Sequence, residues 1–204
     1  MSTAIEALEK MVKEMDNRIA VLEGRQQIPK PKRALKDLET GEKFSLAGHE
    51  WIVLEHDGEG TLVVTAECVE NRAFDDREDC HNSFRSSTIR EYLNVEFFNS
   101  LINSGEVKPE EILLTPWDLT SSDGVDRYGI CEDNIGLLSE KQYKEHKEHL
   151  VINEWWWLRT PIASNALNAR RVRSDGSLSY SSAYYGYVGV RPALRLVSEI
   201  LVGE

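Results

Sequence analysis

The first 24 residues carry the pattern that most constrains how this chain folds. Apolar residues recur there at alternating intervals of three and four, flanked by charge, at Ile5, Leu8, Val12, Met15, Ile19 and Leu22. So strict a seam is typical of a coiled coil, whereas a helix packed on a globular body usually has a wider apolar face. A coiled coil of this length is marginal alone. We therefore predict a parallel coiled-coil oligomerisation helix over residues 1–24, supported by contacts elsewhere in the chain.

Two oligomeric states remain open for this helix. Its β-branched residues at the a positions, with Leu or Met at the d positions, favour a dimer. Against this, Arg18 and Glu23 flank an a/d pair in a pattern typical of short trimeric coils. We expect a homotrimer, with a dimer as the alternative. Gly24 ends the helix, and the proline-containing residues 25–33 form an extended linker.

Charge and cysteine content limit the partners of the chain. Its 24 basic and 35 acidic residues give a formal net charge of −11, whereas binding to nucleic acid or to an anionic membrane needs a basic face. Three widely spaced cysteines without a C-x-x-C motif indicate reduced thiols and no disulfide framework. The N-terminus is polar and no apolar run approaches membrane-spanning length, so we expect neither a secretory signal nor membrane insertion.

Residues 34–204 have the patterns of a compact α+β domain. Alternating apolar residues on both sides of a Gly-containing turn over 43–70 predict a hairpin. Over 86–103 the apolar positions share one helical face, and Ser139 with Gln142 forms a capping box for a second, short helix. The stretches 154–161 and 188–197 are typical of core strands, and a Ser-Asp-Gly turn within 171–180 joins two short strands. Short strands with two inserted helices predict an α+β fold.

Residues 162–187 lack five chemically unrelated residue types. Lys, Glu, Gln, Met and Trp make up 43 of the preceding 161 residues, so about seven are expected in these 26, and none occurs. The stretch is no low-complexity linker. An accidental absence from a polar loop region remains one explanation.

A second explanation comes from the motifs around this stretch. The sequences GHEWIVLE, FDD, SSTIREYLNVEFFNS, IGLLS, WWWLRTP, VRSDGSLS and GVRPALRL occur here in one order over residues 38–197. They resemble a family of bacterial and phage domains with a C-type-lectin-like fold that end in W-W-L-R-[ST]-P…G-V-R-P-A-L. In some members the last segment is the variable region of a diversity-generating retroelement, whose reverse transcriptase copies a template with errors at adenines. Varied AAC or AAT codons cannot specify Trp, Gln, Met, Lys or Glu. The resemblance thus implies a variable segment, 162–187, in which Val172, Asp175 and Gly176 stay fixed to build the hairpin.

The resemblance implies a binding protein and not an enzyme, with no cofactor. Its implied role is that of a phage tail receptor-binding protein, in the virion after cytoplasmic synthesis, or otherwise cytoplasmic. The partner would be a protein or glycan receptor on a cell surface. A mixture of Tyr, Ser, Gly and Asn is also typical of evolved paratopes, and an oligomeric coiled coil would add avidity. The expected ligand-binding residues are Ala163, Ser164, Asn165, Ala166, Asn168, Arg171, Arg173, Ser177, Ser179, Tyr180, Ser181, Ser182, Ala183, Tyr184, Tyr185 and Tyr187.

Strand geometry adds expectations about these side chains. Residues two apart on a strand share a face, so we expect Arg171 and Arg173 to point together, and likewise Ser177 and Ser179. The tryptophans 155–157 are expected to divide between the core and the floor of the variable surface.

Candidates for catalytic or metal chemistry are weaker. His146 and His149 lie on a charged helix without a third ligand, and the Cys80–His81 pair also needs remote ligands. The acidic stretch 118–133, with Asp118, Asp123, Asp126 and Asp133, offers oxygens for Ca²⁺ but not the EF-hand spacing. We predict no metal site and leave calcium in this stretch open.

Other functions on the same fold also remain open. They are an enzyme, a metal-dependent sugar-binding lectin and a purely structural virion protein. We expect Arg159 and Arg191 to be structural, bonded to the backbone or to each other.

Overall fold

The computed structural model of the chain describes residues 11–12, 15 and 32–203. The chain divides into a unit of residues 1–32 and a unit of residues 33–204. In the first unit Met11, Val12 and Met15 are helical and exposed. The other predicted seam positions, Ile5, Leu8, Ile19 and Leu22, lie outside the described residues. Of the linker 25–33, only the last two residues are described. The coiled coil and its strand number stay predictions.

Residues 33–203 form a mixed α+β domain made mostly of strands, and the predicted α+β class is confirmed. The larger sheet has the order β2–β3–β4–β14–β6, with β9 also paired to β14, and all of its pairs are antiparallel. The predicted hairpin over 43–70 contributes three of its strands. The strands are β2 (Lys43–Leu46), β3 (His49–His56), β4 (Thr61–Thr65), β6 (Ile112–Leu113), β9 (Ile135–Gly136) and β14 (Ala193–Leu196).

A second sheet has the order β12–β11–β10–β13–β5, in which only β10 and β13 pair in parallel. Its strands are β5 (Glu70–Asn71), β10 (Trp156–Trp157), β11 (Asn168–Val172), β12 (Leu178–Ser182) and β13 (Gly189–Val190). Two further antiparallel pairs complete the described strands. They join β1 (Arg33–Ala34) to β15 (Leu201–Val202), and β7 (Thr115–Asp118) to β8 (Ile130–Asp133).

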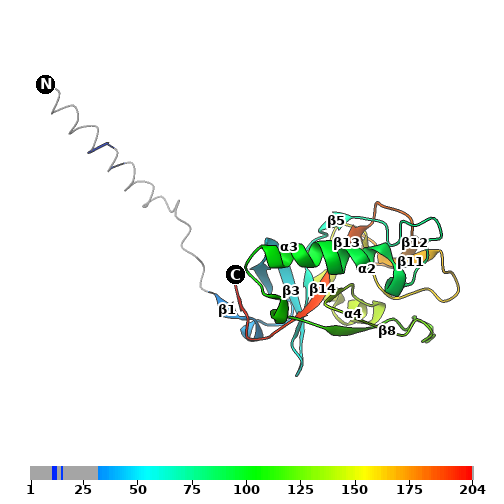
Figure 1. The fold of residues 1–204 in the computed structure, drawn as a ribbon, viewed down its shortest axis with the longest axis horizontal. Coiled ribbons are helices and arrows are strands. Elements are labelled where there is room, and N and C mark those ends of the chain that lie inside the picture. Colours follow the sequence, from blue (N-terminus) through cyan, green and yellow to red (C-terminus); the bar gives the residue numbers. More distant parts are fainter. Residues whose placement is uncertain (1–10, 13–14, 16–31, 204) are drawn as a thin grey trace. The chain divides into compact units, whose positions relative to one another are not determined.

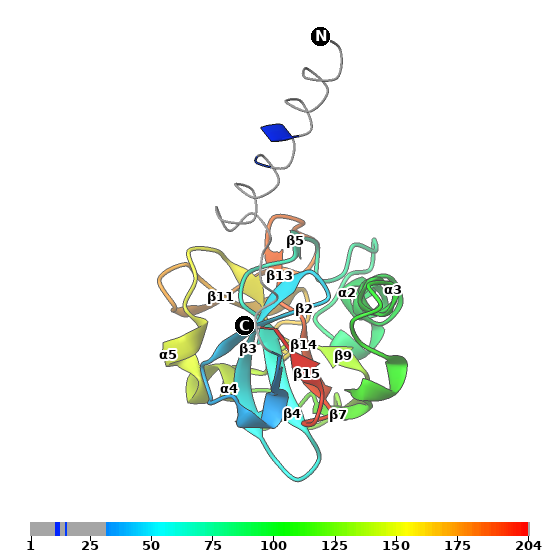
Figure 2. The same cartoon turned by 90° about the vertical axis from the view of Figure 1, so that its left-hand side faces the viewer.

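The predicted first helix runs through three consecutive segments, α2 (Thr88–Tyr92), the π-helical η3 (Leu93–Phe97) and α3 (Phe98–Asn103). It begins at the cap residue Ser87, whose hydroxyl accepts a bond from the backbone N–H of Arg90. Figure 2 shows it end-on beside the larger sheet. Its buried face holds the residues that the periodicity predicts, namely Ile89, Tyr92, Leu93, Phe97 and Leu101.

The second predicted helix is capped as expected but is broken in the middle. Ser139 and Gln142 form the reciprocal capping box at the start of α4 (Glu140–Glu145). His146 then leaves the helical region, at φ −115° and ψ 18°, and α5 (Lys147–Leu150) follows. Three short 3₁₀ turns complete the described helices: η1 (Leu35–Asp37), η2 (Phe84–Ser86) and η4 (Pro109–Glu111).

Two buried arginines hold these elements together through backbone oxygens. Arg191 is fully buried and donates to the carbonyls of Thr65 (3.0 Å), Ala66 (3.0 Å) and Leu150 (2.8 Å), and its guanidinium lies 4.6 Å from the ring centroid of Trp156. Burial lowers the pKa of Arg191 to about 10. The expected structural role of this arginine is confirmed.

Arg159 has the same role near α4. It donates to the carbonyls of Asp118 (3.0 Å) and Leu137 and to Oε1 of Gln142 (2.7 Å). Burial lowers its pKa to about 9. Both arginines therefore bond mainly to backbone oxygens, one of the two arrangements expected, and each ties several separate stretches of chain together.

The two ends of the domain have different contents. In Figure 1, β1 and the C-terminus lie at one end, and β11 and β12 lie at the other. Within the part of the chain that the structure describes, no helix is long and apolar enough to cross a membrane.

Candidate ligand-binding surface

Segment 162–187 forms one edge of the second sheet and the two loops beside it. Residues 168–172 of β11 pair in register with residues 178–182 of β12. The loop 162–167 precedes β11 and the loop 183–188 follows β12. The residues singled out by their composition are thus gathered on one hairpin and its neighbouring loops, at the end of the domain away from β1.

The hairpin turn is the one that the sequence predicts. Gly176 has φ +74°, a left-handed conformation that favours glycine. Oδ1 of Asp175 accepts bonds from the backbone N–H (2.9 Å) and the hydroxyl (2.6 Å) of Ser177. Tyr143 of α4 donates its hydroxyl hydrogen to the carbonyl of Gly176 at 2.7 Å. The turn is therefore fixed both by the side chain of Asp175 and by the hydrogen bond from Tyr143 of α4.

A buried asparagine outside the segment holds the first loop. Nδ2 of Asn82 lies 3.0 Å from the carbonyl oxygen of Ile162, 3.0 Å from that of Asn165 and 2.9 Å from that of Asn168. Its backbone N–H donates to the carbonyl of Ala166 at 2.7 Å. Asn82 is 1% exposed. One residue therefore organises the whole loop 162–168.

A buried aspartate stands beside the second loop. The backbone N–H of Asp75 donates to the carbonyl of Ala183 at 3.0 Å. Its carboxylate accepts two bonds from Arg77, at 2.8 and 3.0 Å, and one from the backbone N–H of His81 at 3.2 Å. Burial by itself raises the pKa of Asp75, but the bonds from Arg77 and His81 outweigh it, and the net result is a lowered pKa. The carboxylate stays ionised and fixes the loop that carries Asn82.

Several framework contacts with the segment share one chemical property. Asn82, Asp75 and Tyr143 all bind main-chain carbonyls of the segment, and the backbone N–H of Leu158 likewise donates to the carbonyl of Arg170 at 2.9 Å. These bonds do not depend on the side chains at the accepting positions. Many side chains of the segment can therefore change while the loops keep their supports.

Half of the sixteen predicted binding residues are exposed. Five more are half-buried, namely Ala163, Asn168, Ser177, Ser179 and Ser182. The exposed residues come from both loops, the turn and β12; they are Ser164, Asn165, Ala166, Arg173, Tyr180, Tyr184, Tyr185 and Tyr187.

Three predicted binding residues are buried and present little or no side-chain surface to solvent. Ala183 is 0% exposed, Ser181 is 8% exposed and Arg171 is 6% exposed. Ser181 and Arg171 lie on the inner face of the hairpin. β11 ends at Val172, and Arg173 is exposed at the turn, whereas Arg171 is buried.

The buried Arg171 belongs to a cluster with three aromatic residues, which we call the Arg171 cluster: Arg171, Trp155, Tyr185 and Tyr187. The Arg171 guanidinium carbon lies 3.7 Å from the ring centroid of Trp155. Ring centroids are 6.1 Å apart for Trp155 and Tyr187 and 5.2 Å apart for Tyr185 and Tyr187. Trp155 is 39% exposed, whereas Trp156 and Trp157 are fully buried. The three tryptophans thus divide between core and surface as expected.

Tyr180 lies on the other face of β12 from Ser179 and Ser181, because neighbouring side chains of a strand alternate. Its pairing partner on β11 is Arg170. Nε of Arg170 lies 3.1 Å from Oε2 of Glu140, and its Nη2 donates to the hydroxyl of Ser122 at 2.9 Å. This face of the hairpin is therefore anchored to α4 by an ion pair, while Tyr180 remains exposed beside it.

Sequence reasoning left out four contributors to this surface and its support. Asn82 gave no signal because its partners are backbone atoms more than 79 residues away. Nothing in the sequence distinguishes Arg170 from the neighbouring arginines 171 and 173. Leu167 is 64% exposed between two predicted binding residues, and Trp155 was expected near the surface but was not included as a contact.

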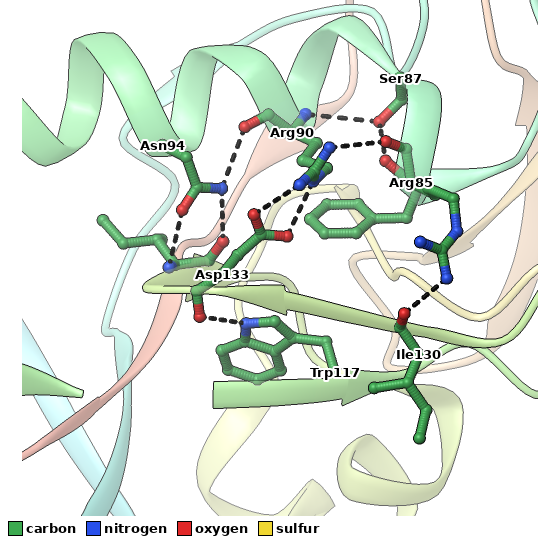
Figure 3. A network of polar contacts seen from close by, with 9 residues as sticks. Arg85, Ser87, Arg90, Asn94, Trp117, Ile130 and Asp133 are labelled. Carbon is green, nitrogen blue, oxygen red and sulfur yellow. Dashed lines mark hydrogen bonds and ion pairs between the residues drawn. The ribbon is translucent and has the colours of Figure 1, made fainter. Parts of the chain in front are cut away.

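The candidate metal ligands do not converge. Figure 3 shows that Asp133 of β8 is bonded to two other elements. Its carboxylate accepts bonds of 2.8 and 2.7 Å from Arg90 of α2, and its carbonyl accepts one from the indole of Trp117 in β7. Oδ1 of Asp118 accepts two bonds from Thr120. Among the described residues, no group of three or more His, Cys, Asp or Glu side chains is arranged to hold a metal ion.

Comparison with known proteins gives a family without a described activity. Residues 58–198 match the family model described as "Domain of unknown function (DUF6273)". No curated protein matches the chain. No solved structure matches it either.

Proposed function

We propose that this chain, which belongs to the DUF6273 family of domains of unknown function, is a ligand-binding protein whose diversified surface is segment 162–187. On this proposal the protein performs no chemistry. It presents the exposed side chains of the hairpin and loops to a protein or glycan receptor on a cell surface, as the receptor-binding protein of a phage tail.

The observation that carries the proposal is the separation between main chain and side chains in this segment. The framework binds carbonyl oxygens at positions 162, 165, 166, 168, 170, 176 and 183. The exposed side chains include four tyrosines, which supply large contact area at low cost in conformational entropy. A surface built in this way can change its specificity without losing its fold, which is the property that a diversifying system requires.

The composition of the segment supports the same proposal. The five residue types that varied AAC and AAT codons cannot encode are all absent from it. Ala183 and Ser181, which are buried, are small residues that fit their sites. Selection for folding would retain small residues there while the exposed positions changed.

The finer assignment of the fold to the C-type-lectin-like class belongs to this proposal. It is supported by the order of the sequence motifs, by the pairing of β1 with β15, the first and last strands of the domain, and by a second sheet built from the long excursion between β4 and β14. The motif Arg159-Thr160-Pro161 and the motif Gly189-Val190-Arg191 act as framework in this fold, since both arginines are buried.

The proposed assembly is a parallel homotrimer, or a dimer, joined by the helix of residues 1–24. β1, the first strand of the domain, lies at the end of the domain away from the hairpin. Two or three copies on one assembly increase avidity without any new contact at each site.

The test of the proposal begins with the DNA on either side of the gene. We expect a near-copy of codons 162–187 whose mismatches fall at adenines of that copy, together with a reading frame for a reverse transcriptase. If the flanking DNA of the source genome holds neither, the segment is not diversified by a retroelement, and the proposal fails in that part.

A second test addresses binding itself and does not depend on the genetic origin. The purified full chain and a variant with Tyr184, Tyr185 and Tyr187 replaced by Ser are compared for adsorption to candidate host cells. We expect adsorption of the wild-type chain and its loss in the variant. Equal adsorption of both proteins to cells that bind the chain would show that the tyrosines are not the contact surface.

A further inference from the structure

The guanidinium of Arg171 is a buried cation without an acidic partner. Arg171 is 6% exposed, and its Nε donates to the carbonyl of Tyr180 at 3.3 Å. Its Nη1 is buried and has no hydrogen-bond partner within the part of the chain that the structure describes. Among the described residues no carboxylate lies within ion-pair distance of it. Glu154, the neighbour of Trp155, interacts with the thiol of Cys68.

The other arginines of the hairpin differ in this respect. Arg170 is paired with Glu140, and Arg173 is exposed to solvent at the turn. Arg191, the most buried arginine, satisfies three carbonyls. An unpartnered donor in a nearly buried guanidinium is costly, because burial without a hydrogen bond removes the bond to water. Arg171 is therefore not explained by its contribution to the fold.

The surroundings of Arg171 are suited to a ligand group that is acidic and partly apolar. Trp155 covers one face of the guanidinium at 3.7 Å, and Tyr187 and Tyr185 extend the aromatic surface outward. The planar guanidinium matches the geometry of a carboxylate. Trp, Tyr and Arg are also the residues that dominate binding energy in protein–protein contacts.

Charge distribution points the same way. The segment holds three arginines and one aspartate, a net charge of +2, so the rest of the chain carries a net charge of −13. The local excess of positive charge on an acidic protein favours an acidic partner at this site, since complementary charge gives specificity.

We propose that the Arg171 cluster binds a carboxylate of an acidic peptide segment of the receptor, with the apolar part of that segment packed on Trp155 and Tyr187. This inference rests on the proposed function, because it names the chemistry of the ligand at the same surface. The carboxylate pairs with the guanidinium of Arg171, and the exposed ring of Trp155 reports its arrival.

Trp155 provides a selective readout. The chain has five tryptophans, and the other four are at most 1% exposed. The probe is the peptide acetyl-Glu-Phe-Glu-amide, titrated into the full-length protein while the indole N–H resonance of Trp155 is followed by NMR. The neutral peptide acetyl-Gln-Phe-Gln-amide is the matched control ligand, and glucuronate represents an acidic sugar.

We expect saturable binding of the acidic peptide and binding about tenfold weaker for the neutral peptide and for glucuronate. The variant R171Q is expected to lose this preference, while K36Q, which removes one exposed positive charge from η1, outside the segment, keeps it. Equal binding of the two peptides by the wild-type chain overturns the inference, even if R171Q does not fold. Glucuronate binding as tight as that of the acidic peptide overturns the peptide assignment.

This experiment and the tests of the proposed function fail independently. A missing template copy in the DNA would leave the carboxylate preference measurable. Conversely, equal binding of the two peptides would remove the acidic ligand and leave the tyrosine surface to be tested by cell adsorption.

Discussion

Nδ2 of Asn82 lies 2.9 Å from the carbonyl oxygen of Asn168, although 86 positions separate the two residues in the chain. The same nitrogen also meets the carbonyls of Ile162 and Asn165. The loop before β11 therefore takes its shape from a residue that lies outside segment 162–187 and is itself buried.

Replacing this residue tests how far the loop depends on it. Asn82→Asp exchanges the donating amide for a carboxylate that faces the same three carbonyl oxygens. We expect it to lower the free energy of unfolding by about 3 kcal/mol, since the buried oxygens lose their donor. Urea denaturation of both proteins measures the difference. Ser164→Ala, an exposed change in the same loop, is the matched control and should have almost no effect; a similar loss in both variants would contradict the role of Asn82.

The separation of exposed and buried positions in the segment gives a second prediction. Tyr185→Asn changes an exposed residue and should alter the free energy of unfolding by about 0.5 kcal/mol or less. Ala183→Asn places a polar side chain in a fully buried site, and we expect a loss of about 2 kcal/mol or more. Both changes introduce a residue that varied codons can encode. Equal effects of the two changes in thermal or urea unfolding would contradict the division of the segment into tolerant exposed positions and intolerant buried ones.

Asp75 gives a prediction about pH. Its folded-state pKa lies below the ordinary value of 3.8, so its contribution to stability is fully present above pH 3.8 and is lost as the pH falls toward the folded pKa. We expect Asp75→Asn to be less stable than wild type by about 2 kcal/mol at pH 7, with the gap narrowing below about pH 4. Chemical denaturation at a series of pH values measures the gap. A gap that stays constant down to pH 2 would show that ionisation of Asp75 is not its source.

Two of the three thiols, Cys68 and Cys131, are expected to react slowly in the folded protein. Burial, with a contribution from Glu154, raises the pKa of Cys68 to about 12, and burial together with Asp133 raises that of Cys131 to about 11. Because the thiolate is the reactive form, we expect both to react with iodoacetamide at pH 8 at least tenfold more slowly than in the urea-unfolded chain. Mass spectrometry of digested samples over time follows each site. Equal rates in folded and unfolded protein would contradict this expectation.

Local patterns in the sequence predict much of the fold. The helix over 88–103 follows from the apolar face that contains Ile89 and Phe97, and the start of α4 follows from the Ser139 capping box. The hairpin turn follows from Gly176, whose positive φ is the conformation that a Ser-Asp-Gly turn favours. In each case the signal lies within a few residues of the feature.

Features that depend on distant contacts are not predictable in this way. Nothing near Asn82 in the sequence indicates that it binds a loop formed by residues 162–168. The alternation of strand residues likewise does not mark the end of β11 at Val172, one residue before Arg173. Ala183 looks like any small residue of a Ser- and Tyr-rich stretch, and only the packing around it shows that it is buried.

The order of the strands determines which mutations within segment 162–187 still allow the chain to fold. β14 lies inside the larger sheet, paired with β4, β6 and β9, and is synthesised after segment 162–187, as are β13 and β15. A frameshift or a stop codon within the segment therefore removes an interior strand and the partner of β1 as well. Such a chain cannot complete its core, whereas a chain with exchanged surface side chains can. Of the changes that can occur within codons 162–187, only those that keep the reading frame open therefore yield a chain that can fold.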